Sequence, residues 1–157
     1  MKSRNISITV EEYGSFSELA TSDKQLVQQA REASKNAYSP YSHFQVGAAV
    51  LLSNGEVVAA SNQENGAYPS GLCAERTALF YAGARFPGAA VVAIAIAAQS
   101  GGRFCARPVY PCGACRQVML ESEMRGGQPV RIIMDGEQAV EVVQSAHDLL
   151  PLSFTLE

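Results

Sequence analysis

The sequence predicts an α/β fold, because runs that are typical of buried strands alternate with runs that are typical of helices. Residues 89–98 form an uninterrupted apolar run, and residues 130–134 resemble a second buried strand. Helical patterns cover residues 73–84 and 112–124, and an apolar strand at residues 44–52 precedes them. The order strand, helix, strand, helix, strand implies right-handed parallel crossovers in one sheet.

Composition narrows the class of protein and of partner. The 157 residues suffice for one domain with its own core, and 17% charged residues is ordinary for a globular protein. No apolar run reaches about 18 residues and no signal-peptide core follows the N-terminus, so we expect a cytoplasmic protein with no membrane partner. A net charge of −3 without a basic cluster argues against a nucleic-acid polymer and favours a small substrate. Four cysteines in that compartment indicate a metal or catalysis.

The N-terminal residues 1–21 are expected to form an arm or a peripheral strand. Apolar and polar residues alternate over residues 6–10, which is typical of a short strand. Ser22 then resembles an N-cap, and Gln25 would complete a capping box. We therefore expect an amphipathic helix over residues 23–36, with its apolar stripe on the core.

A hairpin is expected next. Asn54-Gly55 follows the strand at residues 44–52, and Asn-Gly between apolar runs is the strongest short hairpin signal. The return strand would span residues 56–61 and lead into residues 62–71, a polar, turn-rich loop of the kind that carries binding residues. At residues 140–143 the pattern leaves a strand and a short helix equally possible.

The most informative motif is a pair of cysteines, Cys112 and Cys115, behind Pro111 at the start of a predicted helix. Residues i and i+3 share a helix face, so both sulfurs would point to one side. Unpaired backbone N–H groups and the positive end of the helix dipole stabilise thiolates there. Alone, such a pair fits a redox site as well as half of a structural zinc site.

A third cysteine makes the motif more specific. Cys73 starts the preceding predicted helix, and Glu75 follows two positions later. Zinc deaminases carry a ligand-x-Glu and a Pro-Cys-x-x-Cys segment, with the glutamate as acid–base group. Both helices begin where strands lead into helices, so the three sulfurs are expected to converge. The less specific alternative is a set of buried or redox cysteines beside a surface glutamate.

From about Tyr38 to Phe154 the chain resembles the small, homotetrameric, zinc-dependent cytidine deaminases. The matching segments are Tyr41-Ser42-x-Phe44-x-Val46-Gly47-Ala48-Ala49, Asn62-x-Glu64-Asn65, Cys73-Ala74-Glu75-Arg76-Thr77-Ala78, Pro111-Cys112-Gly113-Ala114-Cys115-Arg116-Gln117 and Leu149-Leu150-Pro151-x-x-Phe154. The resemblance implies a three-layer α/β/α sandwich with a mixed, largely five-stranded sheet. Residues 22–157 would form its single catalytic domain.

The resemblance also implies a reaction, namely hydrolytic deamination of cytidine and 2′-deoxycytidine to uridine and 2′-deoxyuridine, with release of ammonia, in pyrimidine salvage. Cys73, Cys112 and Cys115 would hold one zinc ion per chain and leave the fourth position to water. Glu75 would carry protons between that water and N3 of the ring. Arg76 would lie beside the thiolates and support them.

Substrate contacts are implied in the same way. Phe44 would pack on the pyrimidine, and Asn62 and Glu64 would bind the ribose. The backbone N–H of Ala74 would reach the ring O2, and the carbonyl of Tyr110 would accept a hydrogen bond from the amino group. Without the resemblance, Phe44 would be read as a core residue, and Asn62 and Glu64 as turn formers.

Assembly is expected to involve the apolar tail at residues 149–154. Phe154 and Tyr68 would approach the ligand of a neighbouring subunit in a homotetramer. The alternative for the tail is a final strand packed on its own core.

Two other functions remain compatible with the sequence. A deaminase of a modified cytosine nucleoside or an aminopyrimidine antibiotic would use the same metal ligands. A non-catalytic, zinc-stabilised interaction module belongs to a different class. Glu75 argues against the module, because a purely structural site has no use for an acid two residues from a ligand.

Overall fold

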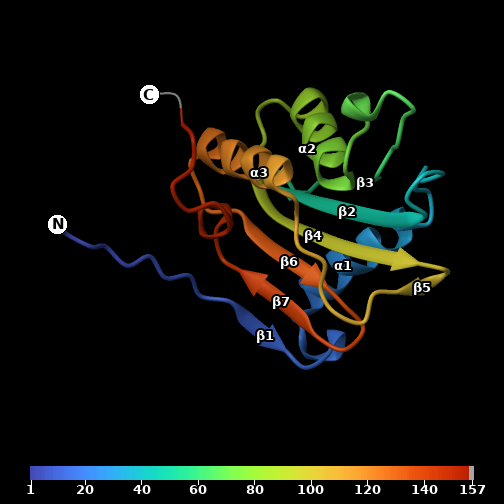
Figure 1. The fold of residues 1–157 in the computed structure, drawn as a ribbon, viewed down its shortest axis with the longest axis horizontal. Helices are drawn as coiled ribbons and strands as arrows, with labels where there is room; N and C mark the ends of the chain where they lie inside the picture. The colour runs from blue at the N-terminus through green and yellow to red at the C-terminus, as the bar shows by residue number, and fades with distance from the viewer. Residues whose placement is uncertain (156–157) are drawn as a thin grey trace.

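A mixed sheet lies between one helix on one face and two helices on the other in the computed structural model, which describes residues 1–155 (Figure 1). The last two residues of the predicted domain lie outside this range. The strands are β1 (Glu11–Tyr13), β2 (Phe44–Leu52), β3 (Val57–Ser61), β4 (Val91–Ser100), β5 (Arg103–Phe104), β6 (Arg131–Asp135) and β7 (Val140–Val143). The helices are α1 (Thr21–Ser34) on one face, and α2 (Ala74–Arg85) and α3 (Gly113–Gly126) on the other. No helix within residues 1–155 combines the length and apolar character needed to cross a membrane.

The strand order is β1-β7-β6-β4-β2-β3, with β5 paired to the end of β4. β4 and β6 pair in parallel, whereas β2 pairs antiparallel with both β3 and β4. β3 and β4 therefore run in the same direction, so α2 and α3 each connect strands of one direction. This confirms the α/β/α sandwich with a mixed sheet, to which the short strands β1 and β5 are added. The ambiguous segment at residues 140–143 is a strand, antiparallel to β6.

The N-terminal region differs from the prediction. Residues 6–10 form no strand, and the strand is β1, paired with β7 at the edge of the sheet. Alternation could not produce a strand at residues 6–10 because β7 ends at Val143 and leaves no partner there. The apolar side chains of this arm are exposed, and Figure 1 shows it leaving the body of the molecule.

The capping box predicted for α1 is wrong. The N-cap is Ala20, without a side-chain hydrogen bond, and the helix begins at Thr21. Asp23 in its first turn is buried and pairs with Arg131 of β6. This contact with a distant strand fixes the start of the helix in place of a local cap. Lys35, rather than Asn36, closes the helix.

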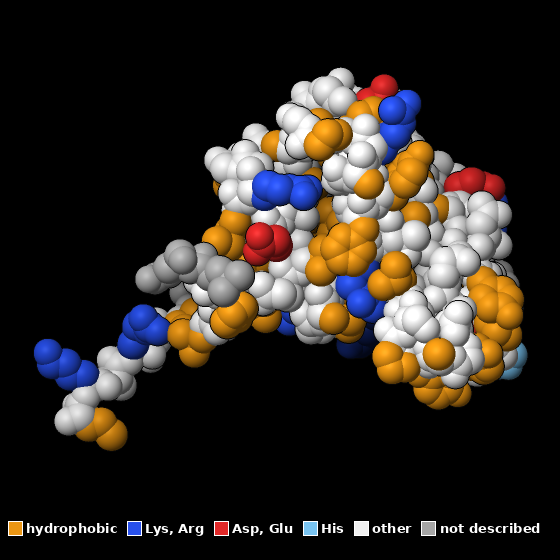
Figure 2. Space-filling view, turned by 90° about the horizontal axis from the view of Figure 1, so that it is seen from above, with side chains coloured by type: hydrophobic (Ala, Val, Ile, Leu, Met, Phe, Trp, Pro, Cys, Tyr) orange, Lys and Arg blue, Asp and Glu red, His pale blue; other side chains and the backbone are white. Residues whose placement is uncertain are grey.

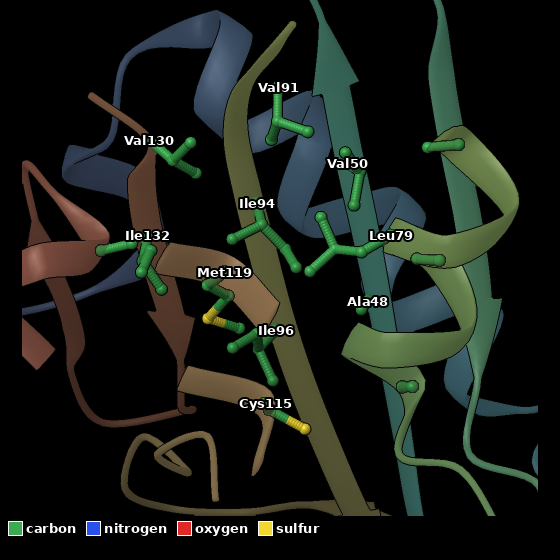
Figure 3. Close-up of a cluster of buried hydrophobic side chains, with 14 of the residues drawn as sticks. Ala48, Val50, Leu79, Val91, Ile94, Ile96, Cys115, Met119, Val130 and Ile132 are labelled. Carbon is green, nitrogen blue, oxygen red and sulfur yellow. The ribbon is translucent and has the colours of Figure 1, made fainter. Parts of the chain in front are cut away.

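The two faces of the sheet carry side chains of different size. On the side of α2 and α3, Ile94 and Ile96 of β4 pack with Leu79 and Met119 (Figure 3). On the side of α1, the same strand presents three buried alanines at positions 93, 95 and 97. Alternation in β4 therefore separates a bulky layer from a thin one.

The thin layer lets α1 lie very close to β2. A Cβ added at Gly47 would lie 1.9 Å from the carbonyl oxygen of Ala30 and 2.5 Å from the amide nitrogen of Ser34. Both distances are below 3.0 Å, so any side chain at Gly47 would force the helix off the strand. β2 and β3 lead into the loop before α2, so this close contact lies in the hairpin from which that loop begins.

Two ion pairs join α1 to β6. Arg31 donates two hydrogen bonds to the Asp135 carboxylate, at 2.7 and 2.9 Å. Asp23 accepts two hydrogen bonds from Arg131 in the same bidentate manner. Both carboxylates are buried, so each depends on its guanidinium partner.

Candidate metal centre

Three cysteine side chains from two helices converge at one end of the core. The Cys73 sulfur lies 3.9 Å from that of Cys112, which lies 3.5 Å from that of Cys115. All three sulfurs lie within 4.8 Å of one another. Cys115 is buried at the end of the core cluster, below Ile96 and Met119 in Figure 3. The convergence expected from the sequence is confirmed.

The helix ends explain this arrangement. α2 and α3 begin one residue later than predicted, so Cys73 and Cys112 are their N-caps, while Cys115 lies in the first turn of α3. Neither N-cap makes a side-chain hydrogen bond to its helix. The orphan N–H groups and the positive dipole ends of two helices therefore meet at the sulfurs, where they stabilise negative charge.

The thiols are electrostatically unequal. Hydrogen bonding with Cys115 is the main cause that lowers the pKa of Cys73 to about 5, and Arg76 and Cys112 add to it against the effect of burial. The interaction with Cys73 and burial raise the pKa of Cys115. Cys73 is therefore more readily ionised than Cys115. A metal would replace the thiol protons, because cysteine binds metals as thiolate.

Glu75 and Arg76 flank the cluster in the first turn of α2. Glu75 is buried, and burial is the main cause that raises the pKa of its carboxyl group. A guanidinium nitrogen of Arg76 lies 3.9 Å from the Cys73 sulfur. Its Nε is buried without a hydrogen-bond partner among residues 1–155. The site therefore pairs a carboxyl group that holds a proton readily with a cation that faces the thiolate.

The donor set fits zinc. Thiolates are preferred zinc ligands, and four-coordinate sites with three protein ligands keep one position open for water or substrate. No fourth cysteine, histidine or carboxylate of the described chain joins the three sulfurs. The arrangement is therefore that of a catalytic rather than a closed structural zinc site.

A cleft of about 530 Å³ opens beside Cys73 and Arg76. Its other walls come from the loop before α2 and from the segment before β2. The lining residues are Tyr41, Ser42, Asn62, Gln63, Glu64, Asn65, Tyr68, Gly71 and Leu72, together with Cys73 and Arg76. Pockets of about 300–1,000 Å³ hold small organic ligands, so the cleft has room for a nucleoside.

Only some of the residues predicted to contact the substrate line this cleft. Asn62, Glu64 and Tyr68 line it, next to Cys73 and Arg76. Phe44, Tyr110 and Phe154 are not among its lining residues, and Ala74 is buried at the start of α2. The Tyr110 side chain turns away to donate to Glu141, at 2.8 Å.

The polar side chains in the cleft also hold its walls. Asn62 accepts a hydrogen bond from the amide of Val46, at 2.8 Å, and donates to the carbonyl of Phe44, at 2.9 Å. Glu64 Oε2 accepts from the amides of Tyr41 and Ser42, at 2.9 and 3.3 Å. Hydrogen bonds from Ser42, its side chain first, and from these backbone amides lower the pKa of Glu64. Glu64 is therefore an ionised acceptor at neutral pH.

Sequence reasoning gave no role to Tyr41, which also lines the cleft. Its ring meets that of Tyr68 edge to face, with centroids 5.6 Å apart at 72°. The two residues belong to different loops, so no periodic signal links them. Tyr41 does stand in one of the segments that carry the family resemblance, and both tyrosines are aromatic residues in polar, turn-rich segments.

Comparison with protein families places the site in context. The model of the cytidine and deoxycytidylate deaminase zinc-binding region matches residues 20–126. The matched range contains the three cysteines, Glu75 and Arg76. It ends at the last residue of α3.

Individual proteins are similar over most of the chain. The cytidine deaminase of Halalkalibacterium halodurans is 52% identical over 98 residues, which are 61% of this chain and 68% of that protein. The cytidine deaminase of Mycobacterium tuberculosis is 39% identical over 139 residues, covering 82% and 86%. Among solved structures, the cytidine deaminase of Burkholderia pseudomallei matches with a TM-score of 0.68 and 41% identity, over 83% of this chain and 97% of that chain.

Proposed function

The chain belongs to the family of zinc-binding cytidine and deoxycytidylate deaminases, and on that premise we propose that it is a cytidine deaminase. It hydrolyses cytidine to uridine and ammonia, and 2′-deoxycytidine is its second substrate, in pyrimidine salvage. The observation that carries the proposal is the convergence of three thiols, joined by no fourth protein ligand within residues 1–155, together with a buried glutamate in the first turn of α2. A closed structural site would have neither the open position nor the glutamate.

Cys73, Cys112 and Cys115 hold one zinc ion per chain. When bound, zinc supplies an activated water as the nucleophile for hydrolysis. Three thiolates donate more negative charge than neutral ligands, which weakens that activation. Positive charge near the sulfurs counteracts this effect and restores part of the activation of water. It comes from the N-termini of α2 and α3 and from the Arg76 guanidinium.

Glu75 is the acid–base group of this proposal. Burial raises the pKa of its carboxyl group, which makes the carboxylate a better proton acceptor. It accepts a proton as water adds to C4 of the ring and delivers it to N3. It then carries the second proton to the departing amino group, so that water and cytidine become uridine and ammonia.

The substrate contacts are proposed on the same premise. Glu64 keeps Oε1 as an acceptor for a ribose hydroxyl, while Oε2 holds the segment before β2. Asn62 would bind the ribose through the side-chain N–H and the oxygen lone pair that its bonds to β2 leave free. Phe44 would pack on the ring, and the Ala74 amide and Tyr110 carbonyl would bind O2 and the amino group.

A homotetramer is the proposed assembly, and exposed apolar side chains support it. Figure 2 shows hydrophobic side chains exposed on the face that carries α2 and α3. Phe80, Tyr81 and Tyr68 are exposed, and residues 150–155 of the tail, the part that the structure describes, form no strand. The Phe154 side chain is 70% exposed, which leaves it available to a neighbouring subunit.

Light scattering of the purified chain should therefore give a tetramer. Phe154→Ala should raise the Michaelis constant for cytidine more than it lowers kcat, because the side chain would act on a neighbour's ligand. Lys2→Ala, on the exposed arm, is the control. A fully active monomer of about 17 kDa would contradict the assembly.

The test of the function itself is the ultraviolet loss of cytidine with ammonia release, together with elemental analysis. We expect one zinc per chain and turnover of cytidine, with both lost in Cys112→Ala. Active protein without metal, or Cys112→Ala with normal zinc and activity, would contradict the proposal. Turnover confined to a modified cytosine nucleoside or an aminopyrimidine would favour that alternative substrate, and zinc without any turnover would favour an interaction module.

Two further proposals concern the domain bounds and the cellular compartment. Residues 22–157 form the catalytic domain, with residues 1–21 as an appended arm. The compartment is the cytoplasm, because metal-binding thiolates persist under reducing conditions.

A further inference from the structure

Arg116 follows Cys115 in the first turn of α3 and connects two parts of the chain that are distant in sequence. Its Nε donates a hydrogen bond to the carbonyl oxygen of Pro111, at 2.8 Å. Its Nη1 donates to the carbonyl oxygen of Leu149, at 3.0 Å. Leu149 is the buried last residue of a short 3₁₀ helix, residues 146–149, that packs against α3. One guanidinium therefore connects the turn before α3 to a fixed point in the body.

The Pro111 carbonyl matters because of what shares its peptide plane. The carbonyl of Pro111 and the amide nitrogen of Cys112 belong to one planar unit, so the orientation of one fixes the other. The next carbonyl, that of Cys112, accepts a hydrogen bond from the Arg116 amide, at 3.0 Å. Both peptide units that flank Cys112 are thus bonded to Arg116, the first through its side chain and the second through its backbone.

Cys112 has few other restraints. It is the exposed member of the three cysteines, whereas Cys115 is buried and Cys73 is half-buried. It makes no side-chain hydrogen bond to the helix that it caps, and its sulfur interacts with those of Cys73 and Cys115. The burial that holds Cys115 in place is therefore not available to Cys112, whose position depends on the peptide units on either side.

We infer that Arg116 is a positioning residue of the metal centre, which orients Cys112 by tying the Pro111 carbonyl to the end of the 3₁₀ helix at Leu149. The inference rests on the proposed zinc binding and goes beyond it. Arg116 touches neither the metal ligands' sulfurs nor the substrate in this role. Its effect should appear in how tightly the metal is held.

The experiment compares Arg116→Gln and Arg116→Lys with Arg125→Gln, which removes an exposed arginine from the far end of the same helix. Zinc affinity is measured by competition with a metallochromic chelator. The absorption spectrum of the cobalt-substituted protein reports ligand geometry, and thermal unfolding of each metal-free variant reports the fold.

Loss of a partner that orients a metal ligand commonly weakens binding by about 10–100-fold, and we expect a change of that size in Arg116→Gln. Arg116→Lys should be nearly as weak, because an ammonium group keeps the charge but cannot span two carbonyls as the planar guanidinium does. The cobalt spectrum should shift in both variants. Arg125→Gln should match the wild type in affinity and spectrum.

Wild-type affinity and an unchanged cobalt spectrum in Arg116→Gln would overturn the inference. Wild-type affinity in Arg116→Lys would also overturn it, because positive charge rather than geometry would then be the cause. If Arg116→Gln does not fold, Arg116→Lys decides alone. A wild-type protein that binds neither zinc nor cobalt would instead overturn the proposed zinc centre, so the two failures are distinguishable.

Discussion

Glu75→Gln should lower the turnover of cytidine by about 10²–10⁴-fold, the usual value of a general acid–base group, and leave the zinc content unchanged. Glutamine has nearly the shape of glutamate but cannot take up a proton and release it again. The three sulfurs come from other residues, so the metal should stay. Steady-state kinetics with elemental analysis of the same preparation measures both quantities.

Glu121→Gln is the matched control, because Glu121 is exposed on α3 and should tolerate the change. The pH dependence adds a second criterion. Burial raises the pKa of Glu75, so the group is protonated below that value and kcat/KM of the wild type should fall as the pH decreases through it. The small residual rate of Glu75→Gln should lack this acidic limb. A variant within a few-fold of the wild type would remove Glu75 from the mechanism.

Arg31→Met should destabilise the fold by about 3–5 kcal/mol, as expected when one member of a buried ion pair is removed. The Asp135 side chain is 1% exposed, so its charge would lose its partner without gaining water. Methionine keeps an unbranched chain between the rings of Phe16 and Phe104, over which the guanidinium now lies at 4.7 and 5.2 Å. Urea unfolding measures the difference. Lys35→Ala, which breaks an exposed pair with Glu32 on the same helix, should change little.

The pH dependence of that deficit has a definite sign. Burial is the main cause that raises the pKa of Asp135, and Arg31 works against it. Without Arg31 the pKa rises further, and a carboxyl group whose folded-state pKa is raised loses stability as the pH increases. The deficit of Arg31→Met should therefore be largest at neutral pH and shrink toward pH of about 4, the ordinary pKa of aspartate. Adding Asp135→Asn should recover much of it. An equal loss at both pH values would contradict the unpaired charge as its cause.

The parts of the fold that the sequence predicted are those with local signals. The hairpin of β2 and β3 is marked by an apolar run and by Asn54-Gly55, and the buried strand β4 by its unbroken apolar run. β1 and β5 are three and two residues long, too short for a period to be visible, and they exist because β7 and β4 offer an edge. The start of α1 could not be predicted because Arg131, more than 100 residues away, fixes it.

The features of the site that could be predicted are likewise those with a signal along the chain. The spacing of Cys73, Cys112 and Cys115 is visible along the chain because each stands at or next to a helix start, and helix starts gather at one edge of the sheet. The bonds of Asn62 to the backbone of β2 were not visible, since they depend on how the end of β3 lies beside β2. The contact of Arg116 with Leu149 was not visible either, because the two residues lie 33 positions apart in the sequence and no local pattern connects them.

The two ion pairs of α1 have a consequence for synthesis on the ribosome. Their second members lie on β6, 104 and 108 residues further along the chain. Chains grow at about 5–20 residues per second, so α1 emerges well before its partners do. In that interval Asp23 and Arg31 lack their partners, so we expect the helix to be held on β2 mainly by its apolar stripe. α1 is synthesised early, but its ion pairs form only when β6 has been synthesised. Nascent chains that stop before Arg131 should therefore be the forms that chaperones and proteases recognise.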